Sequence, residues 1–218
     1  MHLDELNQTI LGPLRFDNFG RSYSSATMKN SLEGGKLFFS VERFDYTKGI
    51  LERLEAYERY LERYPDRIGK DVFYQLAPLN RQKIHTYSRY QSACREKVLK
   101  INQDYGENYE REDGQIIKKG YKAIDIRTDG MKRELLVLRY LAMDVGIVTP
   151  VKDGMNLVWE FFENSKKIIF KIKVAKEMIL SNSKAALILS EGAGTHHQFL
   201  ENGLGGKYHL VTTLFKQI

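Results

Sequence analysis

Short apolar runs alternate with longer amphipathic stretches along this chain, and the alternation predicts strands and helices in turn. The runs that predict strands lie at residues 37–41, 72–77, 121–126, 145–148 and 185–189. Apolar side chains at three- and four-residue steps predict helices at residues 50–64, 81 to about 103, 131 to about 142, and around 175–178. Strands that alternate with helices through short connections favour a parallel, doubly wound sheet, so the fold class that we expect is α/β.

Two of the predicted helices carry many charged residues. On the helix at 50–64 we interpret these residues as a solvated face with ion pairs between successive turns and assign them no function; they are Glu52, Arg53, Glu55, Glu58, Arg59, Glu62 and Arg63. The helix from residue 81 interleaves arginines with tyrosines, which can suggest a nucleic-acid surface. We favour instead a helix with its arginines in water and a buried stripe, made of Ile84, Tyr87, Tyr90, Ala93, Cys94 and Val98.

Two of the predicted strands lead into polar loops with candidate chemistry. After residues 145–148, Thr149, Pro150 and the Asp153-Gly154 pair break the strand into a tight loop, and a helix starts near Met155. Free backbone N–H groups and the positive helix end converge there and favour an anion. The loop after residues 37–41 carries the cations Arg43 and Lys48 at the carboxyl end of a strand, where open α/β sheets bind ligands. Taken alone, each stretch also fits an ordinary connection with its charges in surface ion pairs.

Taken together, the stretches SVERFDYTKGI and TPVKDGMNLV make the pattern specific. They resemble the two signature blocks of the trehalose-6-phosphate synthases, the family 20 retaining glycosyltransferases. Further matches follow in order: YPDRIGKDVFYQLAP with Arg81, then MDVGIVTP, VAKEM and LILSEGAG. The resemblance runs from about Leu37 to Gly194 and implies a Rossmann-like parallel sheet flanked by helices, the carboxy-terminal, donor-binding half of a GT-B glycosyltransferase.

The resemblance also implies a role for each matching residue. Arg43 and Lys48 would contact the phosphates of UDP-glucose, and Asp153 would hold hydroxyls of the donor sugar. Arg81 would bind the phosphate of the acceptor, glucose-6-phosphate, although a surface ion pair stays a fair alternative for it. Backbone amides would cradle sugar and phosphate, from Gly154, Met155, Asn156, Leu157 and Val158, and Glu177 would hold the ribose. Two fixed cations and helix-terminal amides can stabilise a departing diphosphate, so no metal or other cofactor is expected.

Residues 159–174 interrupt the second signature block. In the family, the sequence DGMNLV is followed directly by AKE, whereas here AKE begins only at Ala175. The Lys, Ile and Phe bias of the intervening residues favours an unspliced intron in the gene model; a genuine insertion is the alternative. If the helix after Asn156 runs on through this segment, Phe161 takes the place of the ribose-binding glutamate. We therefore expect UDP binding to be weaker than in a version without residues 159–174.

The amino-acid composition limits the classes of protein and partner that fit this interpretation. The chain has 218 residues, 42% hydrophobic and 28% charged, as in an ordinary globular protein. A net charge of +6 favours phosphates at least as much as nucleic acid, and we expect no nucleic-acid partner. The single cysteine, Cys94, excludes an internal disulfide and suits a reducing compartment. Neither a secretory segment nor an apolar run near the ~20 residues of a membrane helix is present, so we expect a cytoplasmic protein without membrane contact.

The expected organisation is an extension over residues 1–36 and a nucleotide-sugar-binding domain over residues 37–218, with the amino-terminal acceptor domain absent. The leading function is transfer of glucose from UDP-glucose to glucose-6-phosphate, although we expect this polypeptide alone to be inactive because the acceptor's main wall is missing. The alternatives are a silent nucleotide-sugar-binding or regulatory relative, and a synthase for another phosphorylated polyol. A homo-oligomer and a complex with other trehalose-pathway subunits both stay open.

Overall fold

The centre of the protein is a five-stranded sheet in which every neighbouring pair of strands is parallel. The computed structural model describes residues 15–16, 22–23, 32, 34–107, 109–111, 114, 116–117, 119–151, 186–190 and 192. The strands of the sheet are β3 (Leu37–Val41), β4 (Val72–Leu76), β5 (Ile124–Arg127), β6 (Val145–Val148) and β7 (Ala186–Leu189). Two-residue strands β1 (Arg15–Phe16) and β2 (Ser22–Tyr23) form a separate antiparallel pair. The α/β fold class is confirmed, and all five predicted strands are present with ends shifted by three residues at most.

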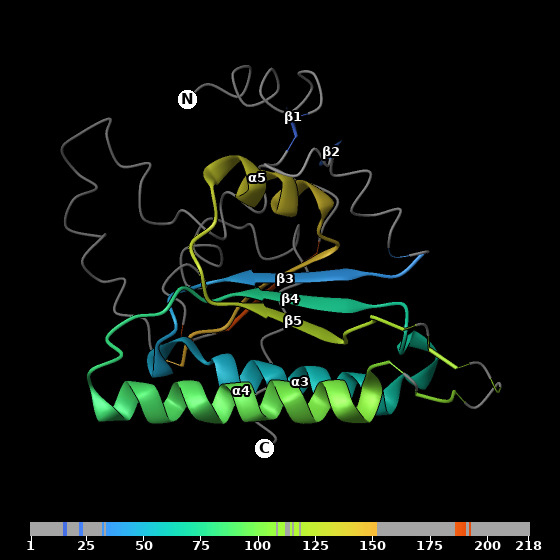
Figure 1. Ribbon diagram of the computed structural model, residues 1–218, viewed down its shortest axis with the longest axis horizontal. Coiled ribbons are helices and arrows are strands. Elements are labelled where there is room, and N and C mark those ends of the chain that lie inside the picture. Colours follow the sequence, from blue (N-terminus) through green and yellow to red (C-terminus); the bar gives the residue numbers. More distant parts are fainter. Residues whose placement is uncertain are drawn as a thin grey trace.

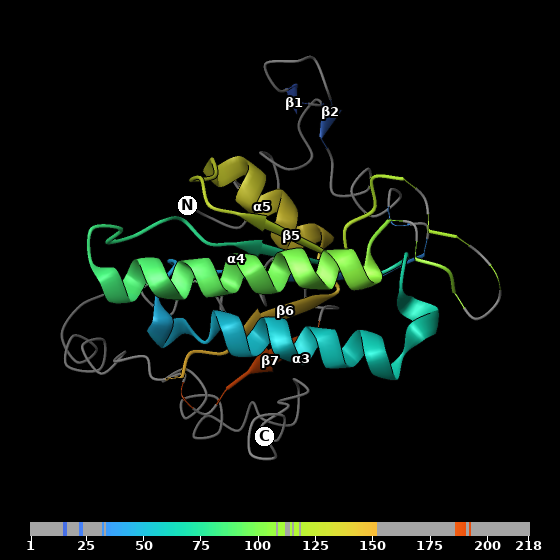
Figure 2. The ribbon, with the colours of Figure 1, turned by 60° about the horizontal axis from the view of Figure 1, so that its bottom comes forward.

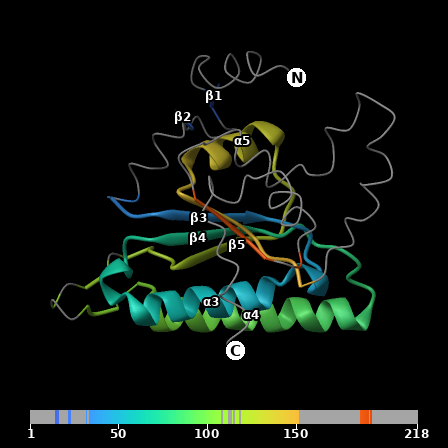
Figure 3. The same cartoon turned by 180° about the vertical axis from the view of Figure 1, so that it is seen from behind.

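Helices cover both faces of the sheet (Figure 1). One face packs against α3 (Ile50–Arg63) and α4 (His85–Tyr105), and the other against α5 (Arg133–Ala142). Figure 3 shows the same layers from behind, with β6 in orange and β7 in red in front of the other strands. Helix α3 ends just before Pro65, whose ring cannot continue a helix and which starts the short 3₁₀ helix η2 (Pro65–Arg67). Helix α4 starts at His85 instead of residue 81, because residues 81–84 form a turn.

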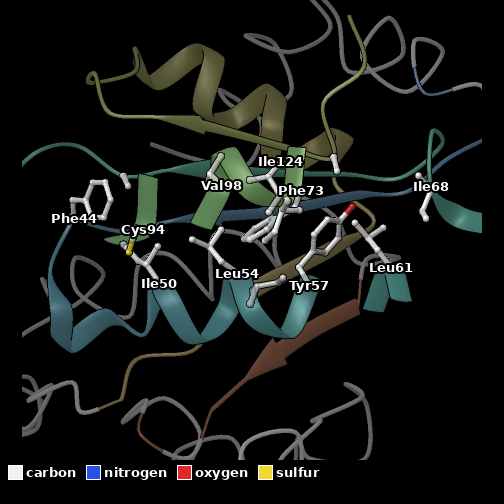
Figure 4. Packing of buried hydrophobic residues seen from close by; sticks show 14 of the residues in the cluster. Phe44, Ile50, Leu54, Tyr57, Leu61, Ile68, Phe73, Cys94, Val98 and Ile124 are labelled. Carbon is white, nitrogen blue, oxygen red and sulfur yellow. The ribbon is translucent and has the colours of Figure 1, made fainter. Parts of the chain in front are cut away.

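The main core lies between the sheet and the layer of α3 and α4. Ile50 and Leu54 of α3 are fully buried in this core, and Tyr57 of the same helix packs against Phe73 of β4 with ring centres 5.4 Å apart (Figure 4). Helix α4 closes this core with Cys94 and Val98. Helices α3 and α4 lie side by side (Figure 2), and an ion pair from Lys97 to Glu58 joins them. Across the sheet, a second core is centred on Phe39 and Tyr140.

The burial of two residues differs from the sequence interpretation. Arg53, assigned to a solvated face, has only 2% of its surface exposed. It lies three residues after Ile50, on the apolar stripe of α3, and several acceptors surround its guanidinium there. Ile84, assigned to the buried stripe of α4, is 47% exposed because it precedes the helix. Tyr87, Cys94 and Val98 are buried as predicted.

The order of the strands in the sheet is β5-β4-β3-β6-β7. The sheet starts with β3; the chain then adds β4 and β5 outward on one side and returns to place β6 on the other side of β3. The direction of winding therefore reverses between β3 and β6. In open α/β sheets, ligands bind in the crevice outside the carboxyl ends of the strands at this reversal. The loops after β3 and β6 are the two that carry the signature motifs.

Candidate functional site

The loop after β3 is fixed by backbone hydrogen bonds on each side of Arg43. The N–H of Glu42 donates to the carbonyl of Leu76 at 3.0 Å, and the N–H of Phe44 donates to the carbonyl of Pro78 at 3.0 Å. Phe44 is fully buried and packs edge-on against Tyr90, whereas Arg43 is exposed. The backbone at Arg43 is thus held in place while its guanidinium reaches into solvent.

Lys48 ends a short 3₁₀ helix, η1 (Tyr46–Lys48), that follows this loop. The buried carboxylate of Asp45 caps η1, accepting from the N–H of Thr47 at 3.1 Å and from its hydroxyl at 3.0 Å. Gly49 comes next with φ 63°, and α3 begins directly after it. Lys48 is therefore held at the entrance of a helix, where backbone N–H groups favour an anion.

The loop after β6 packs against η1, and the loop after β7 packs against the loop after β6. The N–H of Val151 donates to the carbonyl of Thr47 at 3.0 Å. The hydroxyl of Ser190, just after β7, donates to the carbonyl of Pro150 at 2.8 Å. A Cβ on Gly49 would lie 2.2 Å from the carbonyl oxygen of Thr149, so only glycine allows this approach. Three loops at the carboxyl edge, each from one of the matching motifs, are thus held together.

Arg81 lies in the turn after β4 and has an unusual backbone. Its φ is 48°, the one positive φ outside glycine among the described residues. Its Nη1 donates to the hydroxyl of Tyr87 at 2.9 Å, and its guanidinium lies 5.5 Å from the centre of that ring. The Tyr87 hydroxyl in turn donates to Asp45 at 3.5 Å. A chain of polar contacts therefore connects Arg81 to the cap of η1.

Gln91 of α4 strengthens the same connection. Its buried side-chain amide donates to the carbonyl of Asn80 at 3.0 Å and to that of Phe44 at 3.4 Å. The loops after β3 and β4 are thus tied to one helix. Strained backbone conformations occur where surrounding structure fixes them, often at functional sites, and the left-handed Arg81 next to these contacts fits that pattern.

The structure describes only some of the predicted site residues. It places Arg43, Lys48 and Arg81 in loops at the carboxyl edge of neighbouring strands. The other predicted positions lie outside the described residues, namely Asp153, Gly154, Met155, Asn156, Leu157, Val158, Glu177 and the segment 159–174. The placement of Asp153 and Glu177, and the course of the interrupting segment, stay predictions.

Sequence reasoning missed the residues that support the site. Asp45 and Tyr87 connect the candidate cations, and Arg53 lies beneath them in the core. The position of Arg53 on the apolar stripe of α3 was the available signal, because a charged residue there must either be exposed or find buried partners. No comparable signal marks the Tyr87 hydroxyl, since its neighbour Asp45 is far away in sequence.

The arrangement suits the binding of a diphosphate. An exposed arginine provides a planar, bidentate donor and a lysine provides a compact charge. Among the described residues, no group of three or more His, Cys, Asp or Glu side chains is placed to hold a metal ion. Within the same residues, no helix has the length and apolar composition needed to cross a membrane.

A parallel sheet whose winding reverses between β3 and β6 defines a doubly wound α/β protein, a class that binds its ligands at the strand ends. The family model of glycosyltransferase family 20 matches residues 22–204, and the chain belongs to this family. The matched region begins earlier and ends later than the residues 37–194 inferred from the motifs, so part of the predicted extension over residues 1–36 falls within the family.

Similar proteins share this assignment. Over 185 residues the chain is 46% identical to alpha,alpha-trehalose-phosphate synthase (UDP-forming) 2 of Caenorhabditis elegans, a match that covers 83% of this chain and 13% of that protein. The solved structure of the trehalose-6-phosphate protein from E. coli bound with UDP-2-fluoro glucose is 30% identical with a TM-score of 0.67, covering 92% of this chain and 38% of that one.

An alpha,alpha-trehalose-phosphate synthase (UDP-forming) from Burkholderia xenovorans, solved in complex with glucose-6-phosphate, is also 30% identical, with a TM-score of 0.62. That match covers 80% of this chain and 33% of the bacterial one. The chain therefore spans about a third of the solved bacterial relatives, and much less of the nematode protein.

Proposed function

We propose that this chain carries the donor-binding half of a UDP-glucose-dependent trehalose-6-phosphate synthase. The observation that carries the proposal is the contact between the loops after β3 and β6 at the reversal of the sheet. The N–H of Val151, which follows β6, donates to the carbonyl of Thr47, in the segment that carries Arg43 and Lys48. Relatives of the chain are UDP-forming synthases, and solved neighbours hold a UDP-glucose analogue or glucose-6-phosphate.

In the proposed mechanism, Arg43 and Lys48 bind the diphosphate of UDP-glucose. Their charge stabilises the leaving UDP as the bond from the anomeric carbon to the phosphate oxygen breaks. Asp153 orients the glucose through its hydroxyls, and Glu177 holds the ribose. Because no side chain acts as nucleophile, the acceptor hydroxyl attacks from the same face and its proton passes to the departing phosphate oxygen.

Arg81 is proposed to hold the phosphate of glucose-6-phosphate. The contact from Arg81 to Tyr87 and the left-handed backbone at φ 48° support a side chain fixed in one direction. A guanidinium that is fixed before the ligand arrives loses less conformational freedom on binding. Held by its phosphate in this way, the acceptor would keep its attacking hydroxyl near the anomeric carbon of the donor, as transfer between the two sugars requires.

Calorimetric titration of the full chain with UDP, UDP-glucose and glucose-6-phosphate tests the proposal. UDP should bind, and Arg43→Ala should weaken it roughly tenfold or more, since a hydrogen bond to a charged group contributes about 1.5–3 kcal/mol. Arg95→Ala removes an exposed arginine from α4 and should leave UDP affinity unchanged. Absence of UDP binding by the folded chain would overturn the proposal.

Three further parts of the sequence interpretation stay predictions. They are the domain division at residue 37, the cytoplasmic location and the inactivity of this polypeptide by itself. Synthase turnover by the purified chain, followed through UDP release, would contradict the last of them. UDP-glucose binding without turnover would fit both the leading function and the alternative of a silent relative.

A further inference from the structure

Arg53 is a fully buried arginine directly beneath the candidate phosphate site. Its side chain extends from the first turn of α3 and only 2% of its surface is exposed. Burial of a guanidinium costs several kcal/mol unless hydrogen bonds and an opposite charge compensate. Both are present, and they come from several separate segments of the chain.

On one side the guanidinium contacts the ends of three strands. Its Nε donates to the hydroxyl of Thr149 at 2.9 Å, just after β6. Its Nη1 donates to the side-chain oxygen of Gln75 in β4 at 2.9 Å and to the hydroxyl of Ser40 in β3. Arg53 therefore connects β4, β3 and β6 at their carboxyl ends, across the reversal of the sheet.

On its other side the guanidinium contacts the segment after β3, residues 42–48, which carries Arg43 and Lys48 and is called the phosphate loop below. Its Nη2 donates to the backbone carbonyl of Lys48 at 2.9 Å and to the carboxylate of Glu42 at 2.8 Å. Glu42 and Lys48 flank the loop that begins with Arg43. The same side chain thus holds both ends of this loop and the start of the loop that leads toward Asp153.

We propose that Arg53 is the positioning residue of the nucleotide site, which fixes Lys48 and the Thr149 turn in the geometry that binds a nucleoside diphosphate. The proposal rests on the proposed function and extends it to a residue that does not touch the ligand. Arg53 acts through geometry because Glu42 pairs with it at 2.8 Å, and this buried pair has no net charge to offer a phosphate.

The guanidinium is suited to this role in a way that an ammonium is not. Arginine has five N–H donors in a rigid plane, and all three of its nitrogens are used here. Lysine has three donors on a flexible stem and cannot serve acceptors in five directions. Arg53→Lys therefore keeps the positive charge but removes hydrogen bonds that hold Lys48 and the Thr149 turn in place.

A similar group at the opposite edge of the sheet provides the control. Arg67 donates to the buried carboxylate of Asp71 through Nε at 3.0 Å and through Nη2. Asp71 precedes β4, so this pair lies at the amino edge, about 16 Å along the strand from the site. Arg67→Lys disturbs an arginine–carboxylate pair of the same kind without any contact to the phosphate loop.

The experiment measures UDP affinity by calorimetry and melting temperature by circular dichroism in the full chain. Arg53→Lys should weaken UDP binding about tenfold or more at a temperature at which the variant is folded, as expected when a charge-assisted contact is lost. Arg67→Lys should lower the melting temperature while UDP affinity stays within about twofold of the wild type. A merely structural role for Arg53 would lower only the melting temperature, as in the control.

Two milder variants test the role of Arg53 if Arg53→Lys does not fold. Ser40→Ala and Thr149→Val each remove one acceptor of Arg53 at a buried position with little change of shape. Both should weaken UDP binding measurably. Unchanged UDP affinity in the folded variants, beside a wild type that binds UDP, would overturn the inference alone. A wild type without UDP affinity would instead overturn the proposed function beneath it.

Discussion

Replacement of Gly49 by alanine should separate the two signature loops. The Cβ would lie 2.2 Å from the carbonyl oxygen of Thr149, and ordinary contact begins at 3.4 Å, so the loops must move apart by more than 1 Å. The hydrogen bond from Val151 to Thr47, now 3.0 Å, would then be lost. The left-handed backbone at φ 63° adds strain for any residue with a Cβ.

These contributions give the expected size of the effect. The left-handed conformation costs alanine about 1–2 kcal/mol, and one lost hydrogen bond costs about 1 kcal/mol. The free energy of unfolding should therefore fall by roughly 2–3 kcal/mol, measured by urea denaturation. UDP affinity should fall about tenfold or more, because Lys48 precedes Gly49 directly.

Gly120→Ala is the matched control for this substitution. Gly120 also has a positive φ, 86°, but a Cβ there would meet nothing within 4 Å. Its variant should therefore show the backbone strain alone, with UDP affinity unchanged. If Gly49→Ala matched Gly120→Ala in both stability and UDP affinity, the contact between the loops would not matter and the site as described would be wrong.

Four further predictions follow from single features of the chain. Tyr87→Phe removes the hydrogen bond to Arg81 and should weaken glucose-6-phosphate binding several-fold in calorimetry. Burial raises the pKa of the Cys94 thiol to about 12, so iodoacetamide at about pH 8 should label it only after unfolding; labelling of the native protein would contradict its burial. Asp71→Asn, at a fully buried carboxylate, should lower the free energy of unfolding by about 3 kcal/mol in urea. Deletion of residues 159–174 should strengthen UDP binding by about 1–2 kcal/mol, and equal affinities of two folded versions would contradict that view of the segment.

Local patterns were sufficient to predict the strands and the layers. The run Val145–Val148 is short, apolar and mostly β-branched, and it forms a strand with the predicted ends. The start of α4 was less predictable, because Arg81 is a good helix former by propensity and its left-handed backbone depends on Tyr87 and Gln91, which pack against the turn from later in the chain.

The cations of the candidate site could be predicted from the sequence, whereas the residues that hold them in place could not. Arg43 and Lys48 stand at a strand end in a sequence motif, so local pattern and resemblance both pointed to them. The burial of Arg53 depends on acceptors from β3, β4 and β6, and no stretch of neighbouring residues contains that information. The same dependence on distant contacts applies to the bond from Tyr87 to Asp45.

The reversal of strand order also has a consequence for folding kinetics. Contacts between β3 and β4 join residues about 35 positions apart, as in Lys36 and Asp71, whereas the bond from Leu37 to Asp144 that accompanies β6 spans 107 positions. Closing the longer loop costs about 1 kcal/mol more in chain entropy, so β6 should dock after β3, β4 and α3 have come together. The loops after β3 and β6 then meet only in the last step. A nucleotide that bridges them should accordingly slow unfolding and leave the rate of folding nearly unchanged.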